Sequence, residues 1–343
     1  MTLWDNIAGH DWAVGMLSTA VINDRLVHSY LISGPALVGK STLAWTFAQA
    51  LNCLADPVSR RPCGQCRACK LISAHRHPDV ISVEGELSGR GKRTLKIDQL
   101  RELQIALNLT PAEGRFKVAI IDGFNDANTS AANAFLKTLE EPPNYAVIII
   151  TAVDPDLLLP TIPSRCQQIA LRSVPASIIE KTLSAKWGIS PDEAASIARL
   201  ADGRIGWAIN ASQDPGILEQ RAARLNVLDE ITTLDRVGRF RAADKLAGDP
   251  EELMEILRLW LEWWRDLALF QASDSDETVT LDIQSVQRLQ RLSAYWSPEA
   301  VIRSLRQTDT AIWQLERNAN SRLVLENLLL VYPYDRTKTE MVG

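Results

Sequence analysis

Apolar and polar positions alternate in two different periods along the first half of the chain. Four short apolar runs rich in β-branched residues have the length of buried strands, and they lie at 28–33, 79–83, 116–122 and 145–151. Helix-like apolar spacing fills the segments between them, at 41–52, 97–108 and 130–140. Because strands that alternate with helices form parallel sheets covered on both faces, this half predicts an α/β domain.

The pattern of the second half is helical throughout. Two amphipathic segments, 174–188 and 190–203, each begin with a Ser or Pro start signal and end with glycine. From 213 to about 332 the pattern stays helical, with Pro or Gly breaks near 215, 248–250 and 298. The predicted domains are an α/β domain, a small helical domain, a larger all-helical domain and a short tail, over 1–171, 172–212, 213–335 and 336–343.

Composition and charge narrow the class of protein. Hydrophobic residues make up 46% of the chain and charged residues 23%, as in an ordinary soluble protein. The net charge of -5 is not the overall positive charge typical of nucleic-acid-binding proteins, so any DNA contact is expected to be local or made by partners. The start lacks the features of a signal peptide, and the longest apolar stretch, 145–153, is too short to cross a bilayer. We therefore expect a cytoplasmic protein without membrane contact.

A phosphate-binding loop follows the first predicted strand. Residues 34–41 match G-x-x-x-x-G-K-[ST] in full and lead into a helix. The glycines allow backbone N–H groups to wrap phosphates, Lys40 is expected to reach the β/γ-phosphates, and the Ser41 hydroxyl suits Mg²⁺. Asp122 ends a later strand and is the expected second Mg²⁺ partner. The predicted site for ATP or ADP with Mg²⁺ comprises Gly34, Gly39, Lys40, Ser41, Thr42 and Asp122; the alternative is a Gly-rich turn before an unrelated helix.

Four of the five cysteines lie close together in the sequence, at Cys53, Cys63, Cys66 and Cys69. Two successive C-x-x-C spacings and a fourth thiolate suit a tetrahedral structural zinc site in an insertion over 53–77. Disulfides, an iron–sulfur cluster, or replacement of one cysteine by His75 or His77 are the alternatives.

Further motifs carry a resemblance. Residues 133–143 read NAFLKTLEEPP after the Asp122 strand, Thr151 ends the next strand, and 163–166 read PSRC. Together with the phosphate loop and the cysteine insertion, these resemble the AAA+ clamp-loader subunits of bacterial DNA polymerase III, over about residues 4–211. The resemblance implies a P-loop AAA+ α/β domain with a zinc module, a helical lid over 172–212, and an all-α oligomerisation collar over 213–335.

Two departures from the motor pattern of that family point to the delta prime type. Motors carry Asp-Glu where this chain carries Asp122-Gly123, and Gly206 stands where the best-fitting register places a sensor arginine, with Arg204 two residues earlier. The chain ends at 343, without a long extension of the tau type. Because the phosphate loop is intact, we expect ATP to be bound with little or no hydrolysis.

The resemblance also implies what the chain contributes to others. In this family the Ser-Arg-Cys arginine enters the ATP site of the neighbouring subunit, so Arg165 is expected to be an arginine finger in trans; the alternative is an ordinary ion-paired arginine. Thr151 is either a γ-phosphate sensor or a polar strand end, and Cys166 is expected to be a small buried residue. The implied partners within the polymerase III holoenzyme are gamma/tau and delta subunits, with the sliding clamp and primer-template DNA reached through the complex.

Other interpretations stay open. A gamma-type ATPase could take its base from elsewhere, such as Asp126, and a P-loop nucleotide kinase is disfavoured by the long helical region and the lack of an Arg-rich lid. The basic segment 88–99 could face DNA or a partner, or be a solvated loop. Five of the ten tryptophans lie in the C-terminal helical region, which is consistent with either a domain core or an oligomerisation surface.

Overall fold

The computed structural model describes residues 2–87, 93–272, 289–290, 292–317 and 319–334. The chain divides into two compact units, the first reaching Ser212 and the second beginning at Gln213. The predicted tail 336–343 and residues 88–92 of the basic segment lie outside the described residues.

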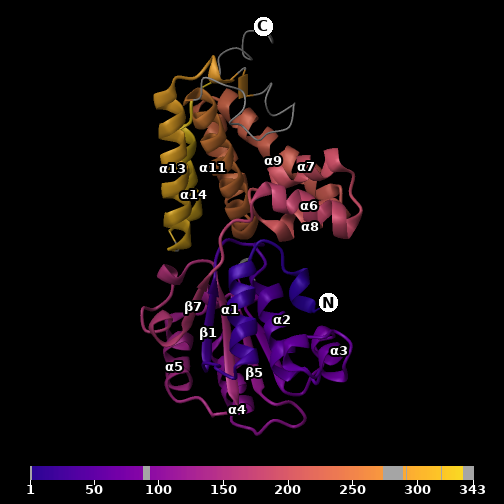
Figure 1. Cartoon of the computed structure of the whole chain (residues 1–343). Coiled ribbons are helices and arrows are strands. Elements are labelled where there is room, and N and C mark those ends of the chain that lie inside the picture. The colour runs from indigo at the N-terminus through magenta and orange to yellow at the C-terminus, as the bar shows by residue number, and fades with distance from the viewer. Residues whose placement is uncertain (1, 88–92, 273–288, 291, 318, 335–343) are drawn as a thin grey trace. The chain divides into compact units, whose positions relative to one another are not determined.

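Five parallel strands form the sheet of the first unit (Figure 1). Their spatial order is β2-β5-β6-β1-β7, and their bounds are β1 (Ser29–Ser33), β2 (Val80–Glu84), β5 (Lys117–Asp122), β6 (Ala146–Ala152) and β7 (Gln167–Ala170). The four apolar runs predicted to be strands are confirmed. Strand β7 was not predicted, because it is an edge strand in which only Ile169 is buried. Since all strands are parallel, their carboxyl ends share one edge of the sheet, where ligands bind in such folds.

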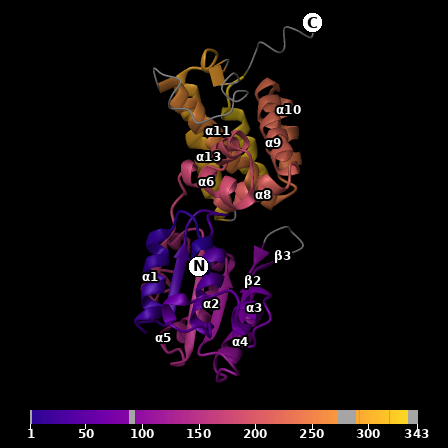
Figure 2. The ribbon, with the colours of Figure 1, turned by 45° about the vertical axis from the view of Figure 1, so that its right-hand side comes forward.

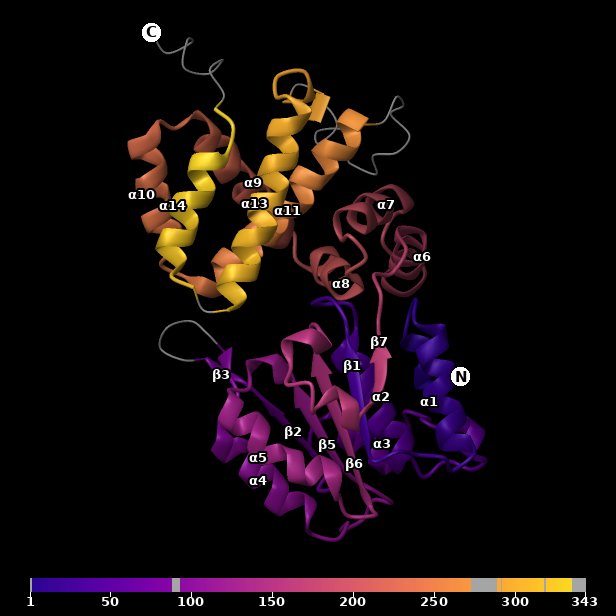
Figure 3. The ribbon, with the colours of Figure 1, turned by 90° about the vertical axis from the view of Figure 1, so that its left-hand side faces the viewer.

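Helices cover both faces of this sheet. Helices α1 (Asp11–Ile22) and α2 (Lys40–Asn52) lie on one face, and α4 (Ile97–Leu107) and α5 (Thr129–Glu140) lie on the other (Figures 2 and 3). Successive side chains of β1 lie on opposite faces of the sheet. The Tyr30 ring packs edge-on against Phe47 of α2, whereas Leu31 joins the hydrophobic cluster that includes Phe135 of α5. The predicted α/β layering is confirmed.

Shorter elements connect these strands and helices. Helix α3 (Arg67–Ser73) packs on α2, and a two-stranded hairpin pairs β3 (Glu86–Leu87) with β4 (Arg93–Thr94). The 3₁₀ turns are η1 (Leu3–Asn6), η2 (Val58–Arg60), η3 (Phe124–Asp126), η4 (Pro155–Leu157) and η5 (Pro163–Arg165).

Three helices end the first unit: α6 (Ala176–Trp187), α7 (Pro191–Leu200) and α8 (Ile205–Gln213). Gly188 ends α6 in the left-handed conformation, and the Ser190 side chain accepts the Glu193 N–H at the start of α7. These are the stop and start signals that predicted the two helices over 174–203.

The regular elements of the second unit are helices in the part that the structure describes. Its helices are α9 (Gly216–Thr233), α10 (Arg236–Leu246), α11 (Pro250–Ala272), α13 (Pro298–Glu316) and α14 (Ser321–Val331). Trp260 and Trp264 are fully buried in its core, where Trp263 and Trp296 join them, whereas Trp313 is 55% exposed. Of the helices described in either unit, none combines the length and the hydrophobicity needed to cross a membrane.

Candidate functional site

The loop between β1 and α2 contains the phosphate-binding sequence. Gly34 has φ 144° and Gly39 has φ 110°, a backbone region that residues with a side chain rarely adopt. A Cβ at Gly34 would overlap the Leu171 carbonyl oxygen, so the close approach of the backbone also requires glycine. Helix α2 begins at Lys40, so the N–H groups of its first turn and its positive dipole end face the loop. The loop therefore has the backbone form that binds an anion.

The Lys40 side chain folds back over this loop. Its Nζ donates to the carbonyl oxygens of Gly34 at 2.7 Å and of Pro35 at 2.6 Å. These carbonyls keep the ammonium at the mouth of the loop. Phosphate oxygens are stronger acceptors for an ammonium than neutral carbonyls, so an anion in the loop would compete for Lys40.

Three polar side chains meet at the carboxyl ends of β5 and β6. The Ser41 hydroxyl donates to Asp122 Oδ2 at 2.6 Å, and the Thr151 hydroxyl donates to Asp122 Oδ1 in a short hydrogen bond. The Thr151 oxygen in turn accepts the Gly123 N–H at 2.9 Å. The structure thus brings together Ser41, Asp122 and Thr151, although Ser41 and Thr151 are 110 positions apart in the sequence. Hydroxyl and carboxylate oxygens are the ligands that Mg²⁺ prefers. Thr42 follows on α2 as an exposed residue.

Gly123, the residue after Asp122, adopts a left-handed conformation with φ 70° and ψ 51°. A residue with a side chain would pay roughly 1–2 kcal/mol for this backbone. A Cβ there would also lie 3.2 Å from Asp126 Oδ2. The turn after β5 is therefore built for glycine, and a water-activating glutamate at this position is both absent and disfavoured.

Gly206 contacts the phosphate loop through its backbone. Its N–H donates to the Leu37 carbonyl oxygen at 2.8 Å, and a Cβ at Gly206 would lie 2.9 Å from the same oxygen. The neighbouring candidate, Arg204, donates through Nε to the Ala201 carbonyl at 3.0 Å. Main-chain contact therefore occupies the space in which a sensor side chain at 206 would begin.

His10 is a contact of the loop that the sequence did not predict. Its side chain is 2% exposed, and its Nε2 lies 2.9 Å from the Val38 carbonyl oxygen. A lone histidine before a helix carries no spacing signal, so only the structure connects it with the loop.

The four clustered cysteines converge on one point, with all Sγ atoms within 4.8 Å of one another. The Cys53 sulfur lies 3.5 Å from that of Cys63 and 3.9 Å from that of Cys66. A zinc tetrahedron with Zn–S distances of about 2.3 Å has S–S edges of roughly 3.8 Å. The donor set and its dimensions therefore fit a structural Zn²⁺ ion.

Backbone N–H groups surround these sulfurs. The Cys63 N–H donates to Cys53 Sγ at 3.4 Å, and the Cys66 N–H donates to Cys63 Sγ at 3.4 Å. Burial raises the pKa of the Cys63 thiol, but hydrogen bonds from the Gln65 and Cys66 N–H groups and the neighbouring thiols outweigh burial and lower the pKa to about 6. Thiolate is the form that binds metal.

The alternative ligands lie elsewhere. The His75 ring packs against that of Trp45 with the planes tilted by 46° and the centroids 3.9 Å apart, and His77 Nδ1 accepts the Asp79 N–H at 3.1 Å. Cys166 lies outside the cluster, and burial raises the pKa of its thiol to about 12. Neither histidine belongs to the sulfur cluster in the described part of the chain.

The side chain of Arg165, at the end of η5, is 33% exposed and bonds away from the phosphate loop. Its Nε donates to Glu140 Oε1 at 2.8 Å, its Nη2 lies 2.5 Å from the same oxygen, and its Nη1 donates to the Thr161 carbonyl at 3.0 Å. The chain's own nucleotide loop receives none of these bonds.

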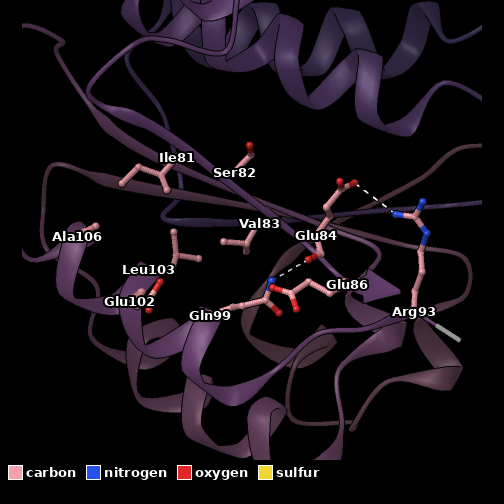
Figure 4. Close-up of a pocket in the computed structure, with 11 residues that line it drawn as sticks. Ile81, Ser82, Val83, Glu84, Glu86, Arg93, Gln99, Glu102, Leu103 and Ala106 are labelled. Carbon is pink, nitrogen blue, oxygen red and sulfur yellow. Dashed lines mark hydrogen bonds and ion pairs between the residues drawn. The ribbon is translucent and has the colours of Figure 1, made fainter. Parts of the chain in front are cut away.

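The described part of the basic segment forms local ion pairs. Arg93 lies 3.6 Å from Glu84, and Lys96 lies 2.6 Å from Glu86. Hydrogen bonding to Glu86 raises the pKa of the exposed Lys96. A pocket of 740 Å³ opens beside these residues along the edge strand β2 (Figure 4). It contains no residue of the phosphate loop, so it is separate from the nucleotide site.

Comparison with known proteins gives consistent matches. A family model described as "DNA polymerase III, delta subunit" matches residues 9–175. The delta' subunit of DNA polymerase III from Pseudomonas aeruginosa is 35% identical over 213 residues, which cover 62% of this chain and 64% of that protein. The gamma subunit from Buchnera aphidicola is 34% identical over 269 residues, covering 75% of this chain and 73% of the relative.

The chain and the DNA polymerase III tau/gamma subunit of Haemophilus influenzae are 36% identical over 179 residues. It covers 52% of this chain but 25% of that protein, so the chain spans about a quarter of the length of this relative. The matched relatives carry both gamma-type and delta prime-type names, and similarity alone does not separate the two.

Proposed function

The chain belongs to the family of clamp-loader AAA+ subunits of bacterial DNA polymerase III, and on this premise we propose that it acts as a subunit of the delta prime type. In this proposal it binds ATP with little or no hydrolysis. It supplies Arg165 to the nucleotide site of a gamma/tau neighbour. Together with gamma/tau and delta subunits, it assists the loading of the sliding clamp onto primed DNA.

One observation carries the distinction between the two types: Asp122 is held between Ser41 and Thr151 and is followed by Gly123 in a left-handed turn. The groups that would bind phosphate and Mg²⁺ lie together, which supports nucleotide binding, whereas no glutamate follows Asp122 to activate a water. The contact of Gly206 with the Leu37 carbonyl supports the same proposal, because it replaces a sensor side chain with backbone. Binding without turnover is the expected result.

In this proposal Arg165 is the residue that acts in the nucleotide site of the neighbouring subunit. Its guanidinium is permanently charged and carries a planar set of N–H donors, which suit the oxygens of a phosphoryl group during transfer. Arginine fingers in related phosphoryl-transfer sites raise the rate by roughly 10³–10⁵. Because Arg165 bonds to Glu140 and Thr161 rather than to the phosphate loop, its position supports a role outside the chain's own site.

We assign the four cysteines to a structural Zn²⁺ ion. Four thiolate ligands leave no open position, so the ion would fix the insertion over 53–77 and take no part in phosphoryl transfer. The Leu3 N–H and the Trp4 indole N–H bond to the carbonyls of Pro62 and Arg61, which ties the N-terminal segment to this module.

The helical regions receive the remaining roles. Helices α6 to α8 would act as the lid over the nucleotide, since Gly206 of α8 contacts the phosphate loop. The helices after Gln213 would form the collar that joins subunits.

Reconstitution tests the proposal. The chain is expected to co-purify with gamma/tau and delta subunits, and the complex is expected to load clamps onto primed DNA in an ATP-dependent way. Arg165→Ala should lower both the DNA- and clamp-stimulated ATP turnover and the clamp loading of that complex. Equal activity of wild-type and Arg165→Ala complexes would overturn the assignment of the finger.

A gamma-type ATPase is the second candidate, because Asp126 Oδ2 lies 3.2 Å from the point where a Gly123 side chain would begin. A carboxylate thus stands close to the place of the missing base. This candidate predicts steady ATP turnover by the isolated chain, lost in Lys40→Ala and in Asp126→Asn. The delta prime proposal predicts no such turnover.

A further inference from the structure

Glu140 and Arg165 form an ion pair between two elements that are fixed independently. Glu140 is the last residue of α5, and the helix stops before Pro142. Arg165 ends η5, which is anchored by Ile162, a residue with no exposed surface. The pair therefore joins the end of α5 to the end of η5 within the first unit.

The contacts of Arg165 divide its guanidinium into an occupied edge and an open one. Nε and one N–H of Nη2 face Glu140 Oε1, and Nη1 donates to Thr161 O at 3.0 Å and to Ser164 Oγ at a longer 3.4 Å. A guanidinium has five N–H donors. Among the described residues, one N–H of Nη2 therefore has no acceptor and one of Nη1 has only the long contact, so the guanidinium can donate to a phosphate without leaving Glu140.

The end of α5 favours this arrangement in a second way. The carboxyl end of a helix carries partial negative charge, which attracts a cation and repels a carboxylate. Glu140 in the last turn is therefore poorly placed for the helix itself, whereas Arg165 against the same turn is well placed. The ion pair with Arg165 therefore stabilises Glu140 at a position where the helix dipole disfavours a carboxylate.

We infer that Glu140 is a positioning residue for the Arg165 finger: it holds the Nε/Nη2 edge of the guanidinium and leaves the outer N–H groups aimed at the phosphate of a neighbouring subunit. The inference rests on the proposed function of Arg165. Glu140 touches no reacting atom and acts only through Arg165. Because a misplacement of a catalytic group by about 1 Å can cost on the order of a hundredfold in rate, holding one flexible side chain matters more to turnover than to folding.

A double-mutant cycle in the reconstituted complex tests this inference. The Arg165-dependent share of turnover is the difference in stimulated kcat between wild-type and Arg165→Ala complexes. Glu140→Gln is expected to lower this share roughly tenfold, an effect on kcat rather than KM, because it loosens the finger without removing the phosphate loop of the neighbour. In the Arg165→Ala background, Glu140→Gln should change nothing further.

A matched control separates positioning from general damage. Glu141→Gln removes the adjacent, exposed carboxylate, which forms no ion pair within the described residues, and it should leave kcat unchanged. Thermal unfolding of the Glu140→Gln chain should stay within a degree or two of wild type, since a partly exposed pair adds little stability.

The outcomes distinguish this inference from the proposed function. If Arg165→Ala has no effect, the finger itself fails. If Arg165→Ala lowers turnover but Glu140→Gln does not, or if the two losses add, the finger stands and the positioning role of Glu140 is overturned.

Discussion

Single glycines determine which groups reach the nucleotide loop. Gly123 takes a left-handed turn beside Asp126, and Gly206 brings its backbone to within hydrogen-bonding distance of the Leu37 carbonyl. In both places a side chain would meet an oxygen atom at or near 3 Å. At Gly123 and Gly206 the surrounding atoms therefore disfavour any side chain. These are the positions at which we expect a motor subunit to carry a base and a sensor.

Gly206→Ala tests how tightly α8 is fitted to the loop. The new methyl group would lie 2.9 Å from a backbone carbonyl that cannot rotate away, so the free energy of unfolding should fall by roughly 1–3 kcal/mol. Gly15→Ala is the matched control: Gly15 lies within α1 with open space around it, and alanine there should raise the stability by up to about 1 kcal/mol. Urea denaturation measures both. A stabilising effect of Gly206→Ala would show that α8 does not rest on the loop.

The sequence predicted those site residues whose chemistry is tied to spacing. The phosphate loop and the two C-x-x-C pairs follow fixed intervals, and the structure brings Ser41 to Asp122 and gathers the cysteines. Glu140 and His10 could not be predicted, because their contacts join residues 25 and 28 positions apart through the packing of separate elements. No local pattern records such contacts.

At the scale of elements, one buried carboxylate joins three segments of the first unit. Asp79, the residue before β2, has no exposed surface and accepts N–H bonds from residues 112, 113 and 114. It also pairs with the buried Lys117 of β5 at 3.1 Å. Burial raises the pKa of Asp79, but the three N–H groups and Lys117 outweigh burial and hold the pKa well below its usual range.

Asp79→Asn should therefore destabilise the fold. It leaves the Lys117 ammonium buried without its counter-charge, which should cost about 3–5 kcal/mol at pH 7 by urea denaturation. Because the folded pKa is depressed, the contribution of Asp79 is present above the unfolded pKa of about 4 and is lost as the pH falls toward the folded value. Asp24→Asn, which removes an exposed partner of Arg115, should cost less than about 1 kcal/mol. A cost as small as that of Asp24→Asn would contradict this account.

The zinc module is the second element-scale feature that can be tested. Metal analysis of the purified chain should find about one zinc per chain, because the four sulfurs match the size of a zinc tetrahedron. Cys66→Ser should lose the metal while the circular dichroism of the sheet and helices persists. Cys166→Ser removes a cysteine outside the cluster and should retain the zinc. A folded, metal-free wild-type chain would refute the assignment.

At this scale the sequence was informative where elements are buried on both sides and weak where they are not. Strands β1, β5 and β6 are apolar along most of their length and were predicted within a residue or two. Strand β7 shows only one buried residue, so its polar pattern resembles a loop. The helices of the second unit were predicted as a class, since their Pro and Gly breaks coincide with the starts of α9, α11 and α13.

At the scale of the whole molecule, the phosphate loop and Arg165 form separate sets of contacts within the first unit. Lys40 bonds to its own loop, and Arg165 bonds to Glu140 and Thr161. A motor that worked alone would need its nucleotide site and its catalytic groups together. The proposed subunit instead keeps a nucleotide for itself and completes the site of a neighbour, so the two functions should be separable by single substitutions.

Lys40→Ala and Arg165→Ala are the two substitutions that separate them. Lys40→Ala should abolish ATP and ADP binding by the isolated chain, measured by calorimetry, because it removes the ammonium at the phosphate loop that is expected to bind the phosphates. In the reconstituted complex it should leave most of the stimulated turnover, since hydrolysis belongs to the neighbours.

Arg165→Ala should keep the isolated chain's nucleotide affinity and lower the turnover of the complex, and Arg165→Lys should do nearly the same, because lysine lacks the planar donor set. Clamp loading should fall further than ATP turnover, since it requires the subunits to act together. Loss of turnover in Lys40→Ala but not in Arg165→Ala would reverse the assignment and identify the chain as a hydrolysing subunit.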